Sequence, residues 1–194
     1  MRVFLIRHAT HDHYGRVLSG RSEGVPLTAR GRDEALRLAE SLSQAGIASL
    51  HSSPRQRCLE TATAIGRAVK QEVRVMDALD EIDFGDWSGM AFSDLEADAG
   101  WAAWNGTRGR CRPPGGETMA EATARTVGHL EAQPETASPL ACVTHCDVIR
   151  GVVGHYLGLD PDHILRFDID PASFSILDIG SWGGKVAALN RVAA

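Results

Sequence analysis

Short apolar runs that alternate with helical patterns are the feature that most constrains the fold of this 194-residue chain. Strand-like apolar runs occupy Arg2–Ile6, Ile47–His51, Val73–Met76, Leu140–Thr144, Ser173–Ile179 and Lys185–Leu189. Helical spacing or helix-start signals occupy 28–46, the segment opened by Pro54, 118–130 and 148–157. Strands that alternate with helices predict a mostly parallel sheet covered by helices on both faces.

Local signals refine this fold. Thr28 suits a helix N-cap, and Thr118 with Glu121 has capping-box spacing. A Gly-rich turn joins the last two strands, which predicts a hairpin and hence one antiparallel edge strand. We therefore expect a three-layer αβα fold with about six strands. Its length suits one domain over residues 1–194, with a helical excursion at about 86–114.

Composition excludes several classes of partner. The formal net charge is −5 and the pI is about 5.9, so no overall charge draws the chain to nucleic acid or anionic lipid. No apolar run reaches the roughly 20 residues of a membrane span. The N-terminal run Met1–Ile6 is too short for a signal-peptide core. We expect a cytoplasmic protein that binds neither membranes nor nucleic acid. The sequence leaves open whether the chain forms a homodimer.

Two histidines follow strands directly. His8 comes after the first strand with Arg7 beside it, and His145 comes after the strand that ends at Thr144. Ligands of α/β sheets bind where the carboxyl ends of strands meet. A histidine in such a place is more commonly structural, but Arg7 adds a guanidinium fork that matches phosphate geometry. The pair indicates a phosphate site.

An ordered set of segments carries a family resemblance. They are Arg7-His8-Ala9, Gly15-Arg16 with Gly20, Pro26-Leu27-Thr28-x-x-Gly31, Ser52–Arg57 with Thr61-Ala62, Glu81–Gly89, Gly115–Thr118, Val143–His145 and Ser173. In this order they resemble the histidine phosphatase superfamily, also called phosphoglycerate mutase-like. The resemblance covers nearly the whole chain, and it is the ordered set, not the Arg-His pair alone, that makes it specific.

The resemblance implies a role for each matching residue. His8 would attack phosphorus and become phosphohistidine, as in ordinary covalent catalysis. Arg7, Arg57 and an imidazolium at His145 would surround the phosphoryl oxygens. With that positive charge supplied by side chains, we expect no metal and no cofactor. The neighbouring Arg55 is expected on the surface.

Glu81 is the proton donor that the resemblance selects. Its neighbours Asp80 and Asp83 have the same chemistry, so the residue types alone do not decide among the three. A general acid near neutral pH needs a raised pKa, which burial beside a phosphate would produce. The alternative for this cluster is a solvated turn.

The chain departs from the family pattern around the site. Ala9 stands in place of the usual glycine, so the backbone there must avoid positive φ. The loop after it is short and lacks the usual asparagine, so we expect Thr10 or Tyr14 to donate to phosphate instead. Cys146 stands where a small glycine is common and is expected to line the pocket.

Two metal sites are conceivable and disfavoured. Cys142, His145 and Cys146 form one candidate zinc set. His11 and His13 flank Asp12 in the loop, but side chains at alternate positions of an extended loop point apart. Solvated loop residues that help to recognise substrate are the favoured interpretation of that cluster.

The expected function is hydrolysis of a phosphomonoester. A mutase is the main alternative, and it needs a lid to keep water from the phosphohistidine, for which only 86–114 is available. An inactive phosphoester-binding module is a third hypothesis, supported by Ala9 alone. A phosphorylated small molecule is favoured over a phosphoprotein as substrate. The tryptophans of the excursion are Trp87, Trp101 and Trp104. They either form an apolar wall for a nonpolar leaving group or serve only local packing.

Overall fold

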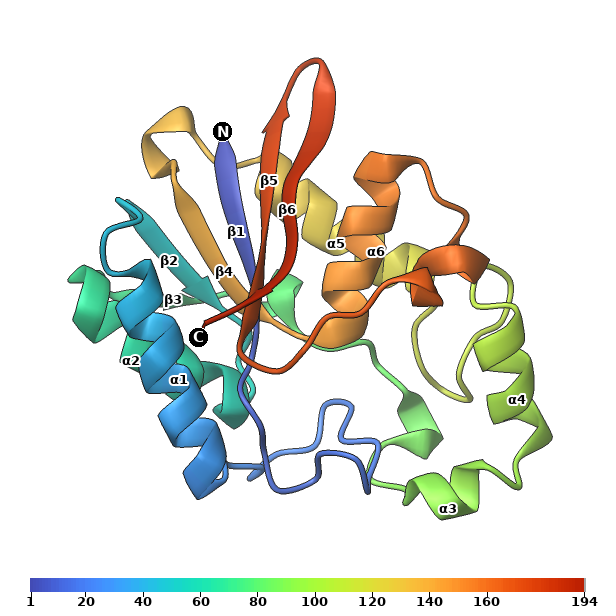
Figure 1. Ribbon diagram of the computed structural model, residues 1–194. Coiled ribbons are helices and arrows are strands. Elements are labelled where there is room, and N and C mark those ends of the chain that lie inside the picture. The colour runs from blue at the N-terminus through green and yellow to red at the C-terminus, as the bar shows by residue number, and fades with distance from the viewer. Residues whose placement is uncertain (194) are drawn as a thin grey trace.

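The computed structural model describes residues 1–193, and its strands form one sheet in the order β3-β2-β4-β1-β5-β6 (Figure 1). The strands are β1 (Arg2–Arg7), β2 (Ser49–Ser52), β3 (Val73–Val75), β4 (Leu140–Thr144), β5 (Ser173–Gly180) and β6 (Gly183–Val192). Strands β1, β4, β2 and β3 pair in parallel, whereas β5 pairs antiparallel with both β1 and β6. The predicted α/β fold, mostly parallel with antiparallel pairing at one side, is confirmed.

Helices cover both faces of this sheet. The α-helices are α1 (Ala29–Leu42), α2 (Gln56–Val69), α3 (Phe92–Leu95), α4 (Ala99–Gly106), α5 (Met119–Glu131) and α6 (Cys146–Leu157). Successive residues of β1 point to opposite faces. Phe4 and Ile6 therefore join the core under α1 and α2, while Val3 and Leu5 join the core under α5 and α6. Strand β1 is thus buried on both faces, as its continuous apolar run predicts.

Side chains cap two helices as predicted. The Thr28 hydroxyl accepts a hydrogen bond of 2.9 Å from the Gly31 amide at the start of α1. At the start of α5, Thr118 and Glu121 form both halves of a capping box. Each cap satisfies backbone groups that the first helical turn leaves unpaired.

The boundaries around Pro54 differ from the prediction. Strand β2 covers Ser49–Ser52 instead of Ile47–His51, and α2 begins at Gln56 with Arg55 as its extended N-cap. The Ser53 amide still donates to the Val143 carbonyl at 2.9 Å, so the sheet continues to this residue. Pro54 and Arg55 therefore lie in the turn between β2 and α2, and α2 begins after them and not at Pro54 as predicted.

The excursion at 86–114 lies outside the two helix layers and contains α3 and α4 (Figure 1). Trp87 and Trp104 are buried in a third apolar cluster with Leu95, so these two tryptophans serve packing. The loop after β1 is joined to this excursion by backbone pairing of Val17 with Ala91. None of the helices within residues 1–193 has the length and apolar character that a membrane crossing requires.

Close packing at Gly31 gives a stability prediction. A Cβ at this position would lie 1.8 Å from the Thr10 carbonyl oxygen. We expect Gly31→Ala to lower the free energy of unfolding by about 3 kcal/mol through overpacking. Gly128→Ala is the matched control, because Gly128 is an exposed helical glycine with open space around it; it should raise stability by about 0.5–1 kcal/mol. Urea unfolding measures both, and equal stability of the two variants would contradict this packing.

Candidate active site

His8 lies directly after β1 and is 3% exposed. Its backbone amide donates to the Thr144 carbonyl at 3.0 Å, which extends the β1–β4 pairing by one residue. Nδ1 lies 2.9 Å from the Ala9 carbonyl oxygen. Because a carbonyl only accepts, Nδ1 holds the proton and Nε2 of the neutral ring keeps its lone pair. Burial, together with Arg57 and Arg7, lowers the pKa of His8 well below 6.5 and keeps the ring neutral.

Ala9 fits its position without backbone strain. It is absent from the residues with positive φ in the described chain, and its amide donates to the Thr61 hydroxyl at 3.1 Å. The replacement of the usual glycine therefore leaves the backbone after His8 in an ordinary conformation. The only sequence argument for an inactive binding module loses its physical basis.

His145 faces His8 from the end of β4, with 5.2 Å between the ring centroids. Arg57 Nη2 donates to His145 Nδ1 at 3.1 Å, so the ring proton belongs on Nε2. His145 Nε2 then donates to Ser53 Oγ at 2.8 Å, and Ser53 Oγ donates to Asp80 Oδ1 at 3.3 Å. Burial and Arg57 lower the pKa of His145 well below 6.5, so the free enzyme holds a neutral ring and not the expected imidazolium.

Arg57 and Arg7 bring unpaired guanidinium nitrogens to the same place. Arg57 is 1% exposed and donates from Nη2 to the Gly20 carbonyl at 2.7 Å. Its Nε and Nη1 are buried without a partner among the described residues, and so is Nε of Arg7. Buried polar groups are normally satisfied, and guanidinium donors match phosphate oxygens. These nitrogens are suited to bind an anion.

Of the three neighbouring acidic residues Asp80, Glu81 and Asp83, Glu81 is the one that lines the cavity containing His8. Its Oε2 lies 3.6 Å from His145 Nδ1, and its Oε1 accepts from the Ile82 amide at 3.0 Å. Burial, with a contribution from Asp147, raises the pKa of Glu81 to about 7. A carboxyl with this pKa is about half protonated at neutral pH and is able to act as a general acid.

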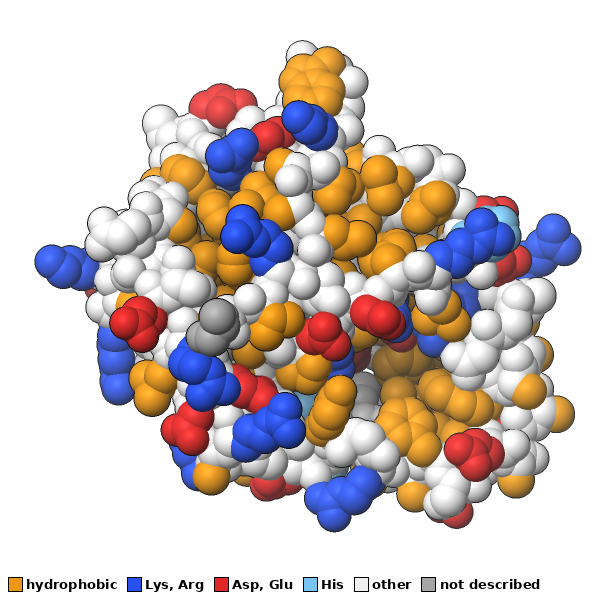
Figure 2. Space-filling view, viewed as in Figure 1, with side chains coloured by type: hydrophobic (Ala, Val, Ile, Leu, Met, Phe, Trp, Pro, Cys, Tyr) orange, Lys and Arg blue, Asp and Glu red, His pale blue; other side chains and the backbone are white. Residues whose placement is uncertain are grey.

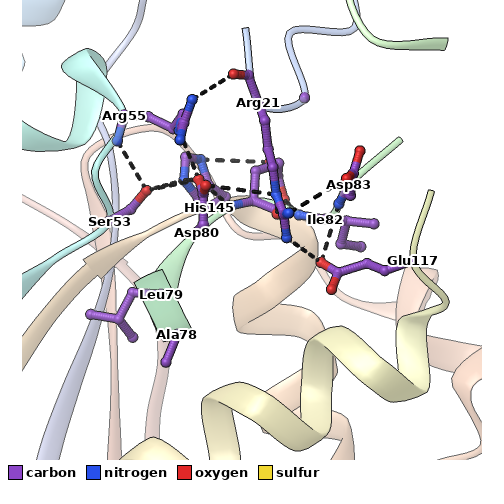
Figure 3. Close-up of polar contacts among 12 residues, drawn as sticks. Arg21, Ser53, Arg55, Ala78, Leu79, Asp80, Ile82, Asp83, Glu117 and His145 are labelled. Carbon is purple, nitrogen blue, oxygen red and sulfur yellow. Dashed lines mark hydrogen bonds and ion pairs between the residues drawn. The ribbon is translucent and has the colours of Figure 1, made fainter. Parts of the chain in front are cut away.

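Glu81 is held by an ion-pair network that sequence reasoning missed (Figure 3). Arg21 Nε donates to the Glu81 carbonyl at 2.8 Å and Nη2 binds Glu117 at 2.9 Å. Arg125 reaches the same Glu81 carbonyl at 3.1 Å. The backbone of Glu81 is thus fixed from both sides, although its side chain has few partners.

Asp80 and Arg55 belong to the same network. Asp80 is 6% exposed, and its Oδ1 lies 3.0 Å from Arg55 Nε. Arg55 also donates to the Arg21 carbonyl at 2.6 Å, so the expected surface position of Arg55 is wrong. The sequence gives no local sign of this pairing, because Arg55 and Asp80 belong to different loops. Ser53 and Asp80 are consequently candidate positioning residues for His145.

The histidine-lined cavity has a volume of about 350 Å³ and includes Arg7, His8, Arg57, Glu81, Tyr14 and Cys146 along its wall. Thr10 is not among its lining residues and instead donates from its amide to Glu34 at 3.0 Å. Of the two expected loop donors, the structure brings only Tyr14 to the cavity. His11 also lines the cavity and is 7% exposed, with its ring centroid 4.9 Å from that of His8. The expectation that His11 is solvated is therefore wrong.

The profile of the histidine phosphatase superfamily, branch 1, matches residues 3–192 of the chain. The chain belongs to this superfamily. The match spans both strand-end histidines together with Arg7 and Arg57, in agreement with the resemblance drawn from the ordered motifs.

Relatives of this histidine phosphatase include both phosphatases and mutases. Phosphoserine phosphatase 1 of Hydrogenobacter thermophilus is 29% identical over 197 residues, which cover 98% of this chain and 92% of that protein. A probable phosphoglycerate mutase of Salmonella paratyphi B is 31% identical over 92% of this chain and 85% of its own length. A mycobacterial glucosyl-3-phosphoglycerate phosphatase, solved with inorganic phosphate, has a TM-score of 0.84 and 27% identity, covering 99% of this chain and 98% of that one.

The candidate zinc set of the sequence is not assembled. Cys142 is buried in the core under α5 and α6, whereas Cys146 donates from Sγ to the Ile169 carbonyl at 3.6 Å. A different group has its ligand atoms within 4.8 Å of one another, formed by His51, His129 and Cys142. This group does not line the cavity that contains His8.

The Ser53 hydrogen bonds give a prediction about His145. We expect Ser53→Ala to leave the Nε2–H of His145 without its acceptor, which shifts the Nε2 signal, and to lower the free energy of unfolding by about 1–3 kcal/mol, since a buried donor loses its partner. Ser52→Ala is the control, because the buried Ser52 hydroxyl donates to the Ser53 carbonyl at 2.9 Å and not to His145. Nitrogen NMR of the histidine rings reports the tautomer. An unchanged His145 signal in Ser53→Ala would contradict the assignment.

Proposed function

We propose that this histidine phosphatase hydrolyses phosphomonoesters through a phosphohistidine at His8. The observation that carries the proposal is the neutral His8 ring, with its Nε2 lone pair free, beside the unpaired nitrogens of Arg57 and Arg7. A nucleophile next to an anion-binding cluster is the arrangement that phosphoryl transfer requires. The phosphatase names of several relatives support the same reaction class.

The reaction proceeds in two steps. His8 Nε2 attacks phosphorus while the bond from phosphorus to the ester oxygen breaks, and Glu81 gives its proton to that oxygen. A water molecule then attacks the phosphohistidine, the P–N bond breaks, and the Glu81 carboxylate takes the proton of the water. Arg7 and Arg57 donate to the phosphoryl oxygens in both steps, and His145 joins them once the negative charge of the bound phosphate favours a proton on its Nδ1. The second step restores the neutral His8 and the protonated Glu81.

Loss of His8 tests the nucleophile. We expect His8→Ala to abolish release of inorganic phosphate, because no other side chain takes over a covalent step. We expect a ³²P-phosphoester to label the parent enzyme rapidly through an acid-labile phosphohistidine and to leave the variant unlabelled. His13→Ala is the control from the neighbouring loop, since His13 is absent from the cavity lining. Full phosphate release by His8→Ala would disprove the mechanism.

A mutase differs in the acceptor of the phosphoryl group. Incubation with 3-phosphoglycerate separates the two reactions, because a phosphatase releases inorganic phosphate whereas a mutase forms 2-phosphoglycerate. The proposal predicts phosphate from those esters that the enzyme accepts and no isomer. Formation of 2-phosphoglycerate without phosphate would assign the chain to the mutases of its family.

The raised pKa of Glu81 predicts a descending limb in the pH dependence of kcat/KM. Because the pKa of Glu81 is about 7 in the free enzyme, the acid is protonated below pH 7 and is lost as pH rises through this value. We expect kcat/KM for alkyl phosphates to fall above pH 7 and Glu81→Gln to remove this limb. The variant should be slowed roughly 100-fold or more on alkyl phosphates and far less on 4-nitrophenyl phosphate, whose leaving group needs no proton. Equal slowing of both esters would exclude Glu81 as the donor.

A further inference from the structure

The active-site cavity is lined by two chemically different sets of side chains. One set is the phosphate-binding pair Arg7 and Arg57. The other set is apolar: Val17 and Leu18 come from the loop after β1, and the rings of Phe84 and Phe92 both pack against Trp101, so these aromatic residues form a continuous part of the lining that we call the apolar end. Figure 2 shows hydrophobic side chains gathered along one side of a hollow on this face of the molecule. We call Phe84, Phe92 and Trp101 the aromatic wall.

The aromatic wall is braced before any ligand binds. The Trp101 ring lies 6.5 Å from Phe84 and 6.3 Å from Phe92, and Trp87 packs edge-on against it at 5.5 Å, between ring centroids. Backbone hydrogen bonds also tie the loop to the excursion, from the Leu18 amide to Met90 and from the Phe92 amide to Arg16, each at 2.9 Å. Such a surface receives an apolar group without first being ordered, which favours binding.

The two further arginines of the cavity lining, Arg108 and Arg150, are both paired with a carboxylate. Arg108 Nη1 binds Asp147 at 2.7 Å, and Arg150 Nη1 binds the other Asp147 oxygen at 3.3 Å. Arg150 also lies 3.6 Å from Asp168. Burial alone would raise the pKa of Asp147, but Arg108 and Arg150 outweigh it and hold this pKa below 3.8, so Asp147 is charged. Both arginines thus already have Asp147 as a partner, and of the two carboxylates only Asp147 lines the cavity.

Partly exposed apolar side chains give this end of the cavity an affinity for hydrocarbon groups. Val17, Leu18, Phe92 and Trp101 are all neither fully buried nor fully exposed, and all four line the cavity. Covering them with a ligand removes apolar surface from water, at roughly 25 cal/mol per Å². A hydrocarbon group gains this contribution, whereas a carboxylate or ammonium group would lose hydration without a partner.

From these observations we infer that the aromatic wall is the leaving-group subsite and that the substrate is the phosphate ester of an uncharged, apolar or aromatic alcohol. This inference rests on the proposed function, because it places the ester oxygen between His8 and the wall. It selects against leaving groups that contain a charge, such as serine or glycerate.

Binding of phosphonates tests the subsite without turnover, since their C–P bond is not hydrolysed. We compare 3-phenylpropylphosphonate with propylphosphonate by calorimetry on the full chain. The phenyl group should lower Kd at least about tenfold through the apolar area it buries. Equal Kd values for the two phosphonates would overturn the inference.

Substitutions locate the effect. Trp101→Ala and, independently, Phe92→Ala should each remove most of the tenfold preference for the phenyl compound. Trp182→Ala is the matched control, because Trp182 is 67% exposed and does not line the cavity. Thermal unfolding checks that each variant is folded, and the use of two wall positions keeps the test valid if one fails to fold. A preference that survives in both wall variants would place the phenyl group elsewhere.

Hydrolysis separates this inference from the proposed function. Release of inorganic phosphate is measured from 3-phenylpropyl phosphate, propyl phosphate and O-phosphoserine, all of which have unactivated alkyl leaving groups. We expect kcat/KM to be at least about tenfold higher for the phenyl ester than for either of the others. Turnover without this preference would refute the subsite alone. Preferential phosphonate binding without release of phosphate from any ester would support the subsite and refute the hydrolase.

Discussion

The parallel pairing of β1 with β4 is the constraint on which the site depends. It places Arg7 opposite Thr144 in register and continues through the hydrogen bond from the His8 amide to the Thr144 carbonyl. The residue that follows each strand, His8 after β1 and His145 after β4, therefore lies at the same edge of the sheet. The two imidazoles are therefore brought to 5.2 Å between centroids by backbone geometry alone. If one of the two strands shifted by one residue, its histidine would turn toward the opposite helix layer while the other histidine stayed in place.

Charge in the cavity is arranged for an incoming anion. The buried histidines are neutral because burial and the arginines lower their pKa values, so the positive charge resides on Arg7 and Arg57. A bound phosphate dianion would satisfy the unpaired guanidinium nitrogens and favour protonation of Glu81 still further. The neutral state of the two histidines limits the repulsion among these buried groups, because only the arginines carry positive charge.

Sequence reasoning succeeded where the signal is local. Strand β4 was predicted at Leu140–Thr144 with the observed bounds, and the Thr118 capping box lies where its spacing indicated. It was wrong about the surface position of Arg55, the solvation of His11 and the expected role of Thr10 as a phosphate donor. Arg55 binds Asp80 across two loops, and His11 is buried with its ring packed edge-on against His8. Such contacts depend on how the connections fold over the sheet, which no local pattern encodes. The convergence of His8, Arg57 and His145 was predicted only because a family pattern supplied what periodicity did not.

The charge balance of the cavity also bears on the acceptor of the phosphoryl group. A mutase must hold its dephosphorylated intermediate and present a second oxygen of that molecule to phosphohistidine, which calls for firm polar contacts to the rest of the substrate. In this chain the arginines beyond the phosphate end, Arg108 and Arg150, are paired with Asp147. The aromatic wall offers an apolar surface in which reorientation of a small charged acid finds no fixed polar partner. Under the proposed mechanism, an alcohol released there would leave the phosphohistidine to the smallest acceptor, water, which would favour hydrolysis over transfer.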